Sequence, residues 1–228
     1  MNDVASTQPD SIRNKQRVGI AFDMESMRHA SQQSWLAVHQ MAKAFTPGLL
    51  ESEAVRIARG ILKDVGMERI WHPIQVRFGA NTLKTFRQKS DPGVVLGEND
   101  IYFIDIGPVF RGHEGDVGAT FTTGDDPDQL ACAAAAKTLF DDVRGRWSRE
   151  RLSGPALYDY AERRAREMGW RLNLGTQGHR VGDYPHSIHR GGTLAAFDSK
   201  PDEGIWVLEI QIAHPGKPFG AFYEDVLL

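Results

Sequence analysis

The sequence has few of the features that mark secreted, membrane-bound or disulfide-stabilised proteins. Cys132 is the single cysteine, so no internal disulfide can form, and its alanine-rich surroundings predict a buried thiol in a reducing compartment. No stretch approaches the roughly 20 apolar residues of a membrane span. The N-terminal segment MNDVASTQPDSIRNKQ lacks the apolar centre of a signal peptide. These absences predict a cytoplasmic protein with no membrane partner.

The chain also lacks an excess of basic residues. Its formal net charge is −3, whereas a nucleic-acid-binding protein normally carries a basic face, so no nucleic-acid partner is expected. The 228 residues are 41% hydrophobic and 25% charged, which is typical of a globular protein with one core. We expect a disordered N-terminal segment over residues 1–15 and a single catalytic domain over residues 16–228. The sequence leaves the oligomeric state open, and a homodimer is compatible with it.

Helix-like and strand-like patterns alternate along the chain. Hydrophobic spacing predicts helices over residues 25–45, 52–65, 125–144 and 153–168. Asp126 and Ser153 are the expected N-caps of the last two helices. Strands are predicted over residues 70–78, 100–107, 115–123, 206–212 and 221–228. Pairs of helices thus alternate with pairs of strands, twice over, and this order predicts an α+β fold of two similar halves with helices covering a curved antiparallel sheet.

Two carboxylates interrupt apolar runs that otherwise have the pattern of buried strands. Asp105 stands in YFIDIG and Glu209 stands in WVLEIQI. A buried carboxylate is costly unless it is paired or bound to a metal. For one such residue, a salt bridge or a strand-end cap is the simpler explanation. Two of them, each with an acidic partner across a hairpin, favour a metal site.

The acidic partners are found at hairpin spacing. Asp105 and Asp116 are symmetric about a glycine-containing turn, and Glu209 and Glu224 are symmetric about the turn 215–218. Directly opposed residues of a hairpin have Cβ atoms roughly 5 Å apart. A bulge would shift the first pairing by about one residue. Each hairpin is therefore expected to place two carboxylates side by side.

Four converging carboxylates would repel one another strongly at neutral pH. Two divalent cations with a bridging hydroxide bring such a cluster near neutrality, and cations about 3.5–4 Å apart activate water between them. His179 lies in the glycine-bracketed stretch GHRVG, where the backbone can bend close to a ligand. The residues therefore favour a dinuclear metal centre that His179 completes.

At these positions the sequence resembles the metallopeptidase family of methionine aminopeptidase, aminopeptidase P, prolidase and creatinase, which has the pita-bread fold. The resemblance covers most of the chain, from about residue 24 to residue 228. The family's Asp-Ile-Gly motif, with a second Asp eleven residues later, matches DIG from Asp105 and DVGATF from Asp116. The family's Gly-His-x-x-Gly, with a second His seven residues later, matches GHRVGDYPH. Its paired glutamates match VLE at Glu209 and YED at Glu224.

The resemblance implies a role for each of these side chains. The ligands of two divalent metal ions would be Asp105, Asp116, His179, Glu209 and Glu224. Asp116 and Glu224 would bridge the metals, and Glu209 would also relay protons. His186 would steady the tetrahedral intermediate that forms when a metal-bridging hydroxide attacks a carbonyl. Ligation that is rich in oxygen and has one imidazole suits Mn or Fe, with Co or Zn as alternatives.

Several positions depart from the family pattern. Phe86 stands where the family has its first active-site histidine, and Ala119 and Phe222 stand where it has arginines. The residues expected to line the substrate pocket are His186, His189, Phe86 and Phe222. Because these changes surround the metals, they put ordinary dipeptide hydrolysis in doubt.

Three further polar residues lie near the motifs. His72 is a candidate to replace the missing histidine from a neighbouring strand. A solvated position is nevertheless the simpler expectation for His72, and also for His113 and Glu114, which lie at a turn.

The predicted metal site indicates an enzyme. The sequence leaves three possible functions open. The favoured one is an aminopeptidase-like hydrolase that cleaves a small peptide, amide or amino-acid derivative. The altered surroundings of the metals favour, as an alternative, an Fe-dependent oxidase or a lyase acting on a small amino acid. A non-catalytic peptide-binding module is the third function, and retention of all five ligands argues against it.

Overall fold

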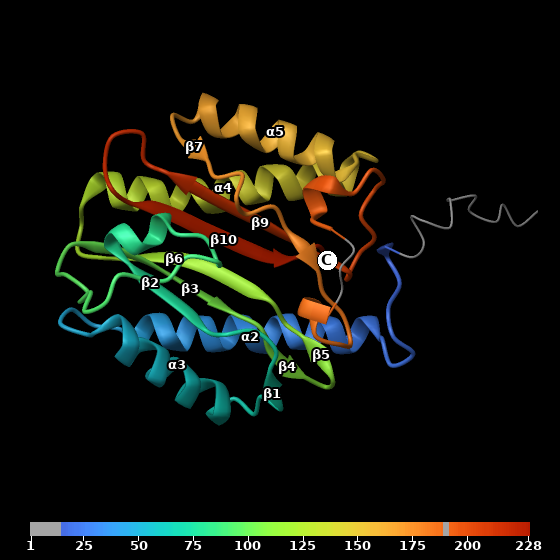
Figure 1. Ribbon diagram of the computed structural model, residues 1–228, viewed down its shortest axis with the longest axis horizontal. Helices are drawn as coiled ribbons and strands as arrows, with labels where there is room; N and C mark the ends of the chain where they lie inside the picture. Colours follow the sequence, from blue (N-terminus) through green and yellow to red (C-terminus); the bar gives the residue numbers. More distant parts are fainter. Residues whose placement is uncertain (1–14, 189–191) are drawn as a thin grey trace, which may run out of the picture.

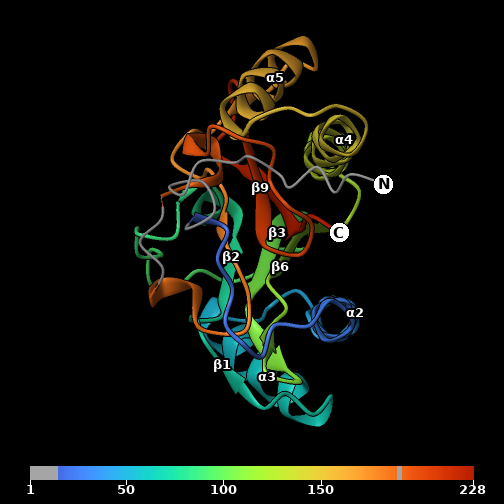
Figure 2. The ribbon, with the colours of Figure 1, turned by 90° about the vertical axis from the view of Figure 1, so that its right-hand side faces the viewer.

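Helices cover one face of a curved sheet in the computed structural model, which describes residues 15–188 and 192–228 (Figure 1). The long α-helices are α2 (Met24–Ala44), α3 (Glu51–Asp64), α4 (Pro127–Arg149) and α5 (Gly154–Glu167). The view turned by 90° places α2 and α4 on one side of the strands and leaves the connecting loops on the other (Figure 2). Figure 1 is therefore seen from the face of the sheet that the helices leave open.

The main sheet has seven strands in the order β2-β3-β6-β10-β9-β7, with β8 also paired to β9. Its strands are β2 (Gln75–Phe78), β3 (Asp100–Ile106), β6 (Val117–Thr123), β7 (Arg171–Leu172), β8 (His179–Arg180), β9 (Trp206–Ala213) and β10 (Gly220–Val226). A small second sheet joins β1 (Arg69–Ile70), β4 (Pro108–Phe110) and β5 (His113–Glu114) in the order β1-β4-β5. All pairings between these strands are antiparallel.

Each half of the molecule buries its own apolar cluster. One cluster packs α2 and α3 against β2, β3 and β6, with Met41, Leu62 and Ile104 fully buried. The other packs α4 and α5 against β9 and β10, with Phe140 and Ile210 fully buried. The halves meet where β6 pairs with β10. The predicted α+β fold of two similar halves, with helices over a curved antiparallel sheet, is confirmed.

Capping residues determine where the helices begin, and tertiary packing determines how far they extend. Asp126 caps α4 by accepting from the backbone N–H groups of Asp128 and Gln129, and Pro127 occupies the first turn, as predicted. Ser153 is at the N-cap position of α5, but its side chain makes no capping hydrogen bond. Helix α4 runs to Arg149, five residues beyond the predicted end. The extra turn is held because Trp147 is buried and its indole N–H donates to the Pro201 carbonyl.

The predicted strand over residues 70–78 is divided in two. Ile70 pairs with Pro108 in the small sheet, whereas Gln75 pairs with Asp105 in the main sheet. Pro73 lies between them, and proline has no N–H to donate to a strand ladder. The chain therefore bends at residues 71–74 and changes sheets.

The predicted register is wrong for the first hairpin and right for the second. Asp105 pairs with Gly118, not with Asp116. The reason is that the chain turns at Arg111 and Gly112, whose φ angles of 49° and 71° match a two-residue hairpin turn. This turn lies one residue later than the expected centre, and the pairing shifts by two residues. Glu209 pairs directly with Glu224, as predicted.

Two sequence expectations concern termini and membranes. The predicted lead-in over residues 1–15 lies outside the described residues except for Lys15, so the domain boundary stays a prediction. In the part of the chain that the structure describes, none of the helices combines the length and the apolar character needed to cross a bilayer.

Two glycines in helices give a direct test of the packing. A Cβ at Gly154 would lie 1.7 Å from the Leu194 carbonyl oxygen, whereas a Cβ at Gly60 would meet nothing within 4 Å. We expect Gly154→Ala to destabilise the protein by about 1–3 kcal/mol, because the backbone must shift to admit the methyl group. Gly60→Ala is the control and should stabilise the protein by roughly 0.5–1 kcal/mol, since alanine is the better helix former. Urea unfolding midpoints measure both, and a Gly154→Ala midpoint at or above that of the wild type would contradict this packing.

Candidate metal centre

A row of carboxylates crosses the open face of the sheet. Asp105 on β3 pairs with Gly118 on β6, Gly118 pairs with Glu224 on β10, and Glu224 pairs with Glu209 on β9. Opposed residues in adjacent strands share a face, so these positions all project to the same side. Gly118 contributes no side chain, and the Asp105 and Glu224 carboxylates can approach each other across it. The register of four strands thus brings three acidic side chains to one place.

Asp116 and His179 reach the same place from the ends of their strands. Asp116 precedes Gly118 by two residues, and His179 on β8 pairs with Val207, two residues before Glu209. Gly178 permits the close approach of β8 to β9: its φ is +68°, and a Cβ there would lie 2.5 Å from the Val207 carbonyl oxygen. The Gly178 N–H donates to Glu209 Oε2 at 2.6 Å.

The structure brings all five predicted ligands together. Three overlapping groups have ligand atoms within 4.8 Å of one another: Asp116, His179 and His186; His72, Asp105 and Asp116; and His179, Glu209 and Glu224. Asp116 and His179 each belong to two of these groups. Asp116 and His179 thus link the three groups into one continuous cluster.

The cluster contains buried oxygens that lack hydrogen-bond partners among the described residues. They are Asp116 Oδ2 and Glu224 Oε1. Two imidazole nitrogens lie near Asp116 Oδ2, His179 Nε2 at 3.3 Å and His186 Nδ1 at 3.5 Å, but neither contact has hydrogen-bond geometry. His179 Nε2 and Asp116 Oδ2 thus converge without bonding to each other, which fits a cation that lies between them. The donor set, oxygen-rich with imidazole, fits a divalent transition metal.

The pKa values of the clustered carboxylates are shifted by burial and by the charges close to them. Burial raises the pKa of Asp105 to about 6. The Asp116 and Glu209 carboxylates also raise this pKa, whereas His72 lowers it. Burial and the neighbouring Asp105 and Asp116 raise the pKa of Glu224 well above its usual range. Burial also opposes ionisation of Asp116, but His72 outweighs it and holds the pKa of Asp116 below its usual range. The cluster thus needs protons or cations to balance its negative charge.

Glu114 and His186 form a second pair at the edge of the cluster. His186 Nδ1 donates to Glu114 Oε1 at 2.9 Å, and the His186 ring lies 4.2 Å from the His179 ring, centroid to centroid. Burial opposes protonation of His186, but the hydrogen bond to Glu114 prevails and raises the pKa of His186. The expectation that Glu114 is solvated is wrong, because Glu114 is fully buried. Sequence reasoning placed His186 in the pocket but missed the carboxylate that orients it.

His72 and His113 are also buried, at 5% and 2% exposure, and the expectation that they are solvated is wrong for both. His72 Nε2 lies 2.9 Å from Asp116 Oδ1 and 3.7 Å from Asp105 Oδ1. Burial opposes protonation of His72, but Asp116 prevails and raises the pKa of His72 to about 10. His113 lies away from the carboxylates and accepts the Asp23 N–H at 2.8 Å. His72 lies on the bend between β1 and β2, and its burial arises from distant segments that its own stretch of sequence does not reveal.

The predicted pocket residues have different surroundings. Phe86 is 60% exposed, and its ring centroid lies 6.4 Å from that of His72. Phe222 is buried two residues before Glu224, where its ring fills the space beside Gly118 and contacts Phe103. His189 lies outside the described residues. A substrate-binding role for these three residues stays a prediction.

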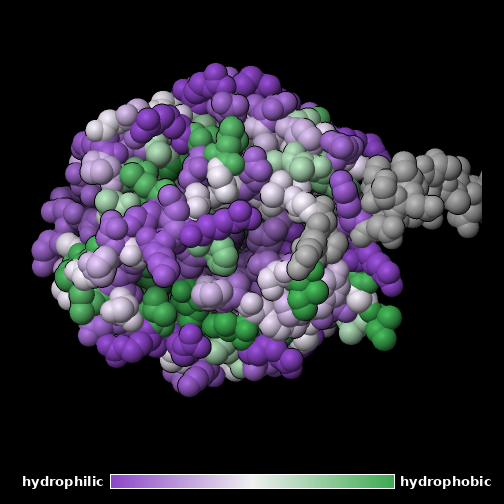
Figure 3. All heavy atoms as spheres, viewed as in Figure 1, coloured by the Kyte–Doolittle hydropathy of each residue, from purple (hydrophilic) through white to green (hydrophobic). Residues whose placement is uncertain are grey.

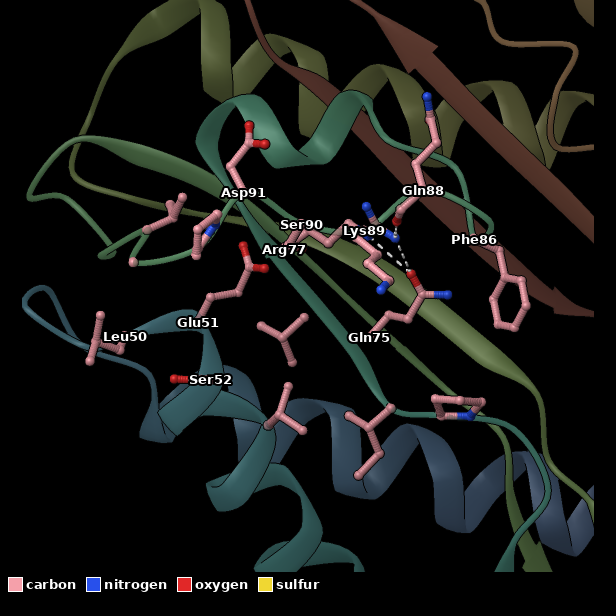
Figure 4. A pocket seen from close by; sticks show the side chains of 17 residues that line it. Leu50, Glu51, Ser52, Gln75, Arg77, Phe86, Gln88, Lys89, Ser90 and Asp91 are labelled. Carbon is pink, nitrogen blue, oxygen red and sulfur yellow. Dashed lines mark hydrogen bonds between the residues drawn. The ribbon is translucent and has the colours of Figure 1, made fainter.

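A groove runs beside the metal cluster, along β2 and the start of α3 (Figure 4). Glu51, Gln75, Arg77 and Phe86 line it, and Arg77 donates to the Gln75 side chain and to the Gln88 carbonyl. None of the described lining residues belongs to the three ligand groups. On the surface, hydrophilic residues surround a hollow near the centre of the open face (Figure 3).

Comparisons with solved structures show that other proteins share this fold. The chain superposes on X-Pro aminopeptidase from Thermotoga maritima with a TM-score of 0.74 and 20% identity, covering 94% of this chain and 60% of that one. Prolidase from Pyrococcus furiosus gives a TM-score of 0.74 and 20% identity, over 95% of this chain and 64% of that one. Methionine aminopeptidase from Thermotoga maritima gives a TM-score of 0.69 and 14% identity, over 88% of this chain and 90% of that one.

These structures share the fold, and the chain spans about 60% of the length of the first two. No curated protein matches the chain at a significant level. The sequence model of metallopeptidase family M24 matches residues 25–228, a range that includes every described residue of the metal cluster. On this match and on the pita-bread fold, the chain belongs to metallopeptidase family M24.

Proposed function

We propose that the chain is a hydrolase that uses two divalent cations to cleave a small peptide, amide or amino-acid derivative. The observation that carries the proposal is the set of three overlapping donor groups, linked through Asp116 and His179, each with its ligand atoms within 4.8 Å of one another. Membership of a metallopeptidase family supports the same reaction class. The proposed ligands are Asp105, Asp116, His179, Glu209 and Glu224, and the proposed metals are Mn or Fe, with Co or Zn as alternatives.

The cations would supply Lewis-acid chemistry, polarising the substrate carbonyl and lowering the pKa of a water molecule. The chain's own residues would bind the cations, position the substrate and move protons. Asp116 and Glu224 would each contribute to both cation positions, because Asp116 belongs to two of the donor groups and Glu224 lies between Glu209 and Gly118 in the row.

Glu209 is the residue proposed to transfer the proton. Its Oε2 accepts the Gly178 N–H, which fixes the carboxylate at the edge of the site. A fixed carboxylate can take a proton from the attacking water and deliver it to the leaving amine. Glu209 would therefore act first as a general base and then as a general acid.

His186 is proposed to stabilise the negative charge that develops on the substrate. Its Nδ1 is held by buried Glu114, so its Nε2 is left to contact a substrate oxygen. A ring that is protonated at both nitrogens would donate from Nε2 to that oxygen. Phe86, Phe222 and His189 are proposed to line the surrounding pocket. A cytoplasmic location stays the prediction made from the sequence.

Removing a central ligand should remove metal binding. We expect purified wild-type protein to bind two Mn²⁺ or Fe²⁺ ions per chain and to melt at a higher temperature with metal than after chelation, since ligand binding stabilises the folded state. Asp116→Asn should lose most of the bound metal and the metal-dependent rise in melting temperature. Glu98→Gln, at an exposed position, is the control and should keep both. Equal metal content in the Asp116→Asn variant and the wild type, by elemental analysis, would contradict the ligand assignment.

The reaction is tested with short peptides, including Met-X and X-Pro dipeptides, in the presence of Mn²⁺, Fe²⁺ or Co²⁺. We expect amine release that stops on chelation. Glu209→Gln should lower kcat by about 10²–10⁴ through loss of proton transfer. His186→Ala should lower kcat by about 10²–10³ with a smaller change in KM, since its proposed contact strengthens in the transition state. Metal-loaded protein that consumes oxygen with an amino acid, and releases no amine from any peptide or amide, would contradict hydrolysis.

A further inference from the structure

His72 reaches the metal cluster from outside the strands that carry the family motifs. It lies on the bend between β1 and β2, and that bend is fixed on both sides. Before it, Ile70 pairs with Pro108 and the Trp71 N–H donates to the Gly107 carbonyl. After it, Gln75 pairs with Asp105. The backbone therefore holds the buried imidazole over the end of β3.

Gly107 provides the space that the ring occupies. A Cβ at Gly107 would lie 2.1 Å from His72 Cδ2 and 2.3 Å from His72 Nε2. Any other residue at this position would displace the ring from the carboxylates. Gly107, two residues after Asp105, thus has a specific structural role in this chain.

The hydrogen bond made by Nδ1 of His72 fixes the direction in which Nε2 points. His72 Nδ1 lies 3.0 Å from the Pro73 carbonyl oxygen, and a carbonyl only accepts, so Nδ1 carries a proton. Nε2 lies 2.9 Å from Asp116 Oδ1 and 3.7 Å from Asp105 Oδ1, so without a metal it donates a second proton to Asp116. A cation that takes the place of this proton would meet the lone pair of Nε2. A lone pair that faces two carboxylate oxygens is stable when a cation lies between them.

His179 has the same arrangement. Its Nδ1 lies 2.7 Å from the Arg180 carbonyl oxygen, and its Nε2 points towards Asp116 Oδ2 at 3.3 Å. An imidazole that donates one nitrogen to a backbone carbonyl and offers the other is the usual state of a metal-ligating histidine. The two rings thus face different oxygens of the central Asp116 carboxylate: His72 Nε2 lies within hydrogen-bonding geometry of Oδ1, whereas His179 Nε2 faces Oδ2 without it.

His113 shows the contrast within the same molecule. It is as buried as His72, and its Nδ1 likewise lies 2.8 Å from a carbonyl oxygen, that of Arg111. Its Nε2, however, accepts the Asp23 N–H at 2.8 Å. Both nitrogens of His113 are thus used by the backbone, whereas Nε2 of His72 faces only carboxylates among the described residues.

We infer that His72 is a sixth protein ligand of the metal centre, and that it holds the first cation together with Asp105 and Asp116. The inference rests on the dinuclear centre of the proposed function. Each cation would then have one imidazole, from His72 at the first position and from His179 at the second. An added nitrogen ligand favours later transition metals such as Co²⁺ or Zn²⁺ over Mn²⁺ at the first position.

The inference is tested by metal content and by X-ray absorption on the metal-loaded full chain. Wild-type protein should hold two Co²⁺ ions with an average of one imidazole per metal. His72→Ala should lower the affinity for the first cation by more than about 10–100-fold, which is the usual loss when a residue that hydrogen-bonds to a metal ligand is removed. At limiting metal it should retain about one ion per chain. Gly107→Ala keeps the histidine but blocks its place, and it should weaken the same cation. His113→Ala is the matched control and should bind both ions with unchanged imidazole scattering.

Circular dichroism and thermal melting of each apoprotein show whether the variants are folded, and Gly107→Ala gives a second route if His72→Ala is not. A folded His72→Ala variant that keeps two ions at wild-type affinity and the same imidazole count would overturn the inference, even if its turnover fell. Wild-type protein that binds no divalent cation would instead overturn the proposed function itself, so the two failures are distinguishable.

Discussion

Mutual repulsion among buried carboxylates is the constraint on which this structure depends. Asp105, Glu209 and Glu224 lie in one row across four strands, and Asp116 joins them from the end of β6. Apolar packing of helices on the opposite face fixes the strands and keeps these groups together despite their charge. Cations are the natural counterpart, because they turn the repulsion between fixed anions into a strong binding site. The same repulsion, together with burial, raises the pKa values of Asp105 and Glu224, because binding a proton would remove one of the negative charges.

The centre is shared between the two halves of the fold. Asp105, Asp116 and His72 come from the half that contains α2 and α3, whereas His179, Glu209 and Glu224 come from the half that contains α4 and α5. The halves join through the pairing of β6 with β10, directly beneath the cluster. The site therefore exists only when both halves are packed. A bound cation is expected to stabilise that junction, since it binds the folded chain and not the separated halves.

The sequence predicted most of the fold and the convergence of the five candidate ligands, and particular residues explain the failures. Glu209 and Glu224 were placed correctly because a turn rich in proline and glycine fixes their register. The pairing of Asp105 was wrong because a non-glycine residue, Arg111, adopts a positive φ and moves the turn by one residue. The burial of His72 and Glu114 was missed because it arises from distant segments: Gly107 makes room for one, and His186 bonds to the other. Such tertiary contacts leave no local pattern in the sequence.

The central claim is that cations unite these side chains, and a crystal structure of the Mn²⁺-loaded protein, with anomalous scattering recorded at the Mn edge, tests it most directly. The account predicts two anomalous peaks about 3.5–4 Å apart, in contact with Asp105, Asp116, His179, Glu209 and Glu224. Anomalous density that lies elsewhere, or a fully loaded crystal with no peak between these five residues, would contradict it.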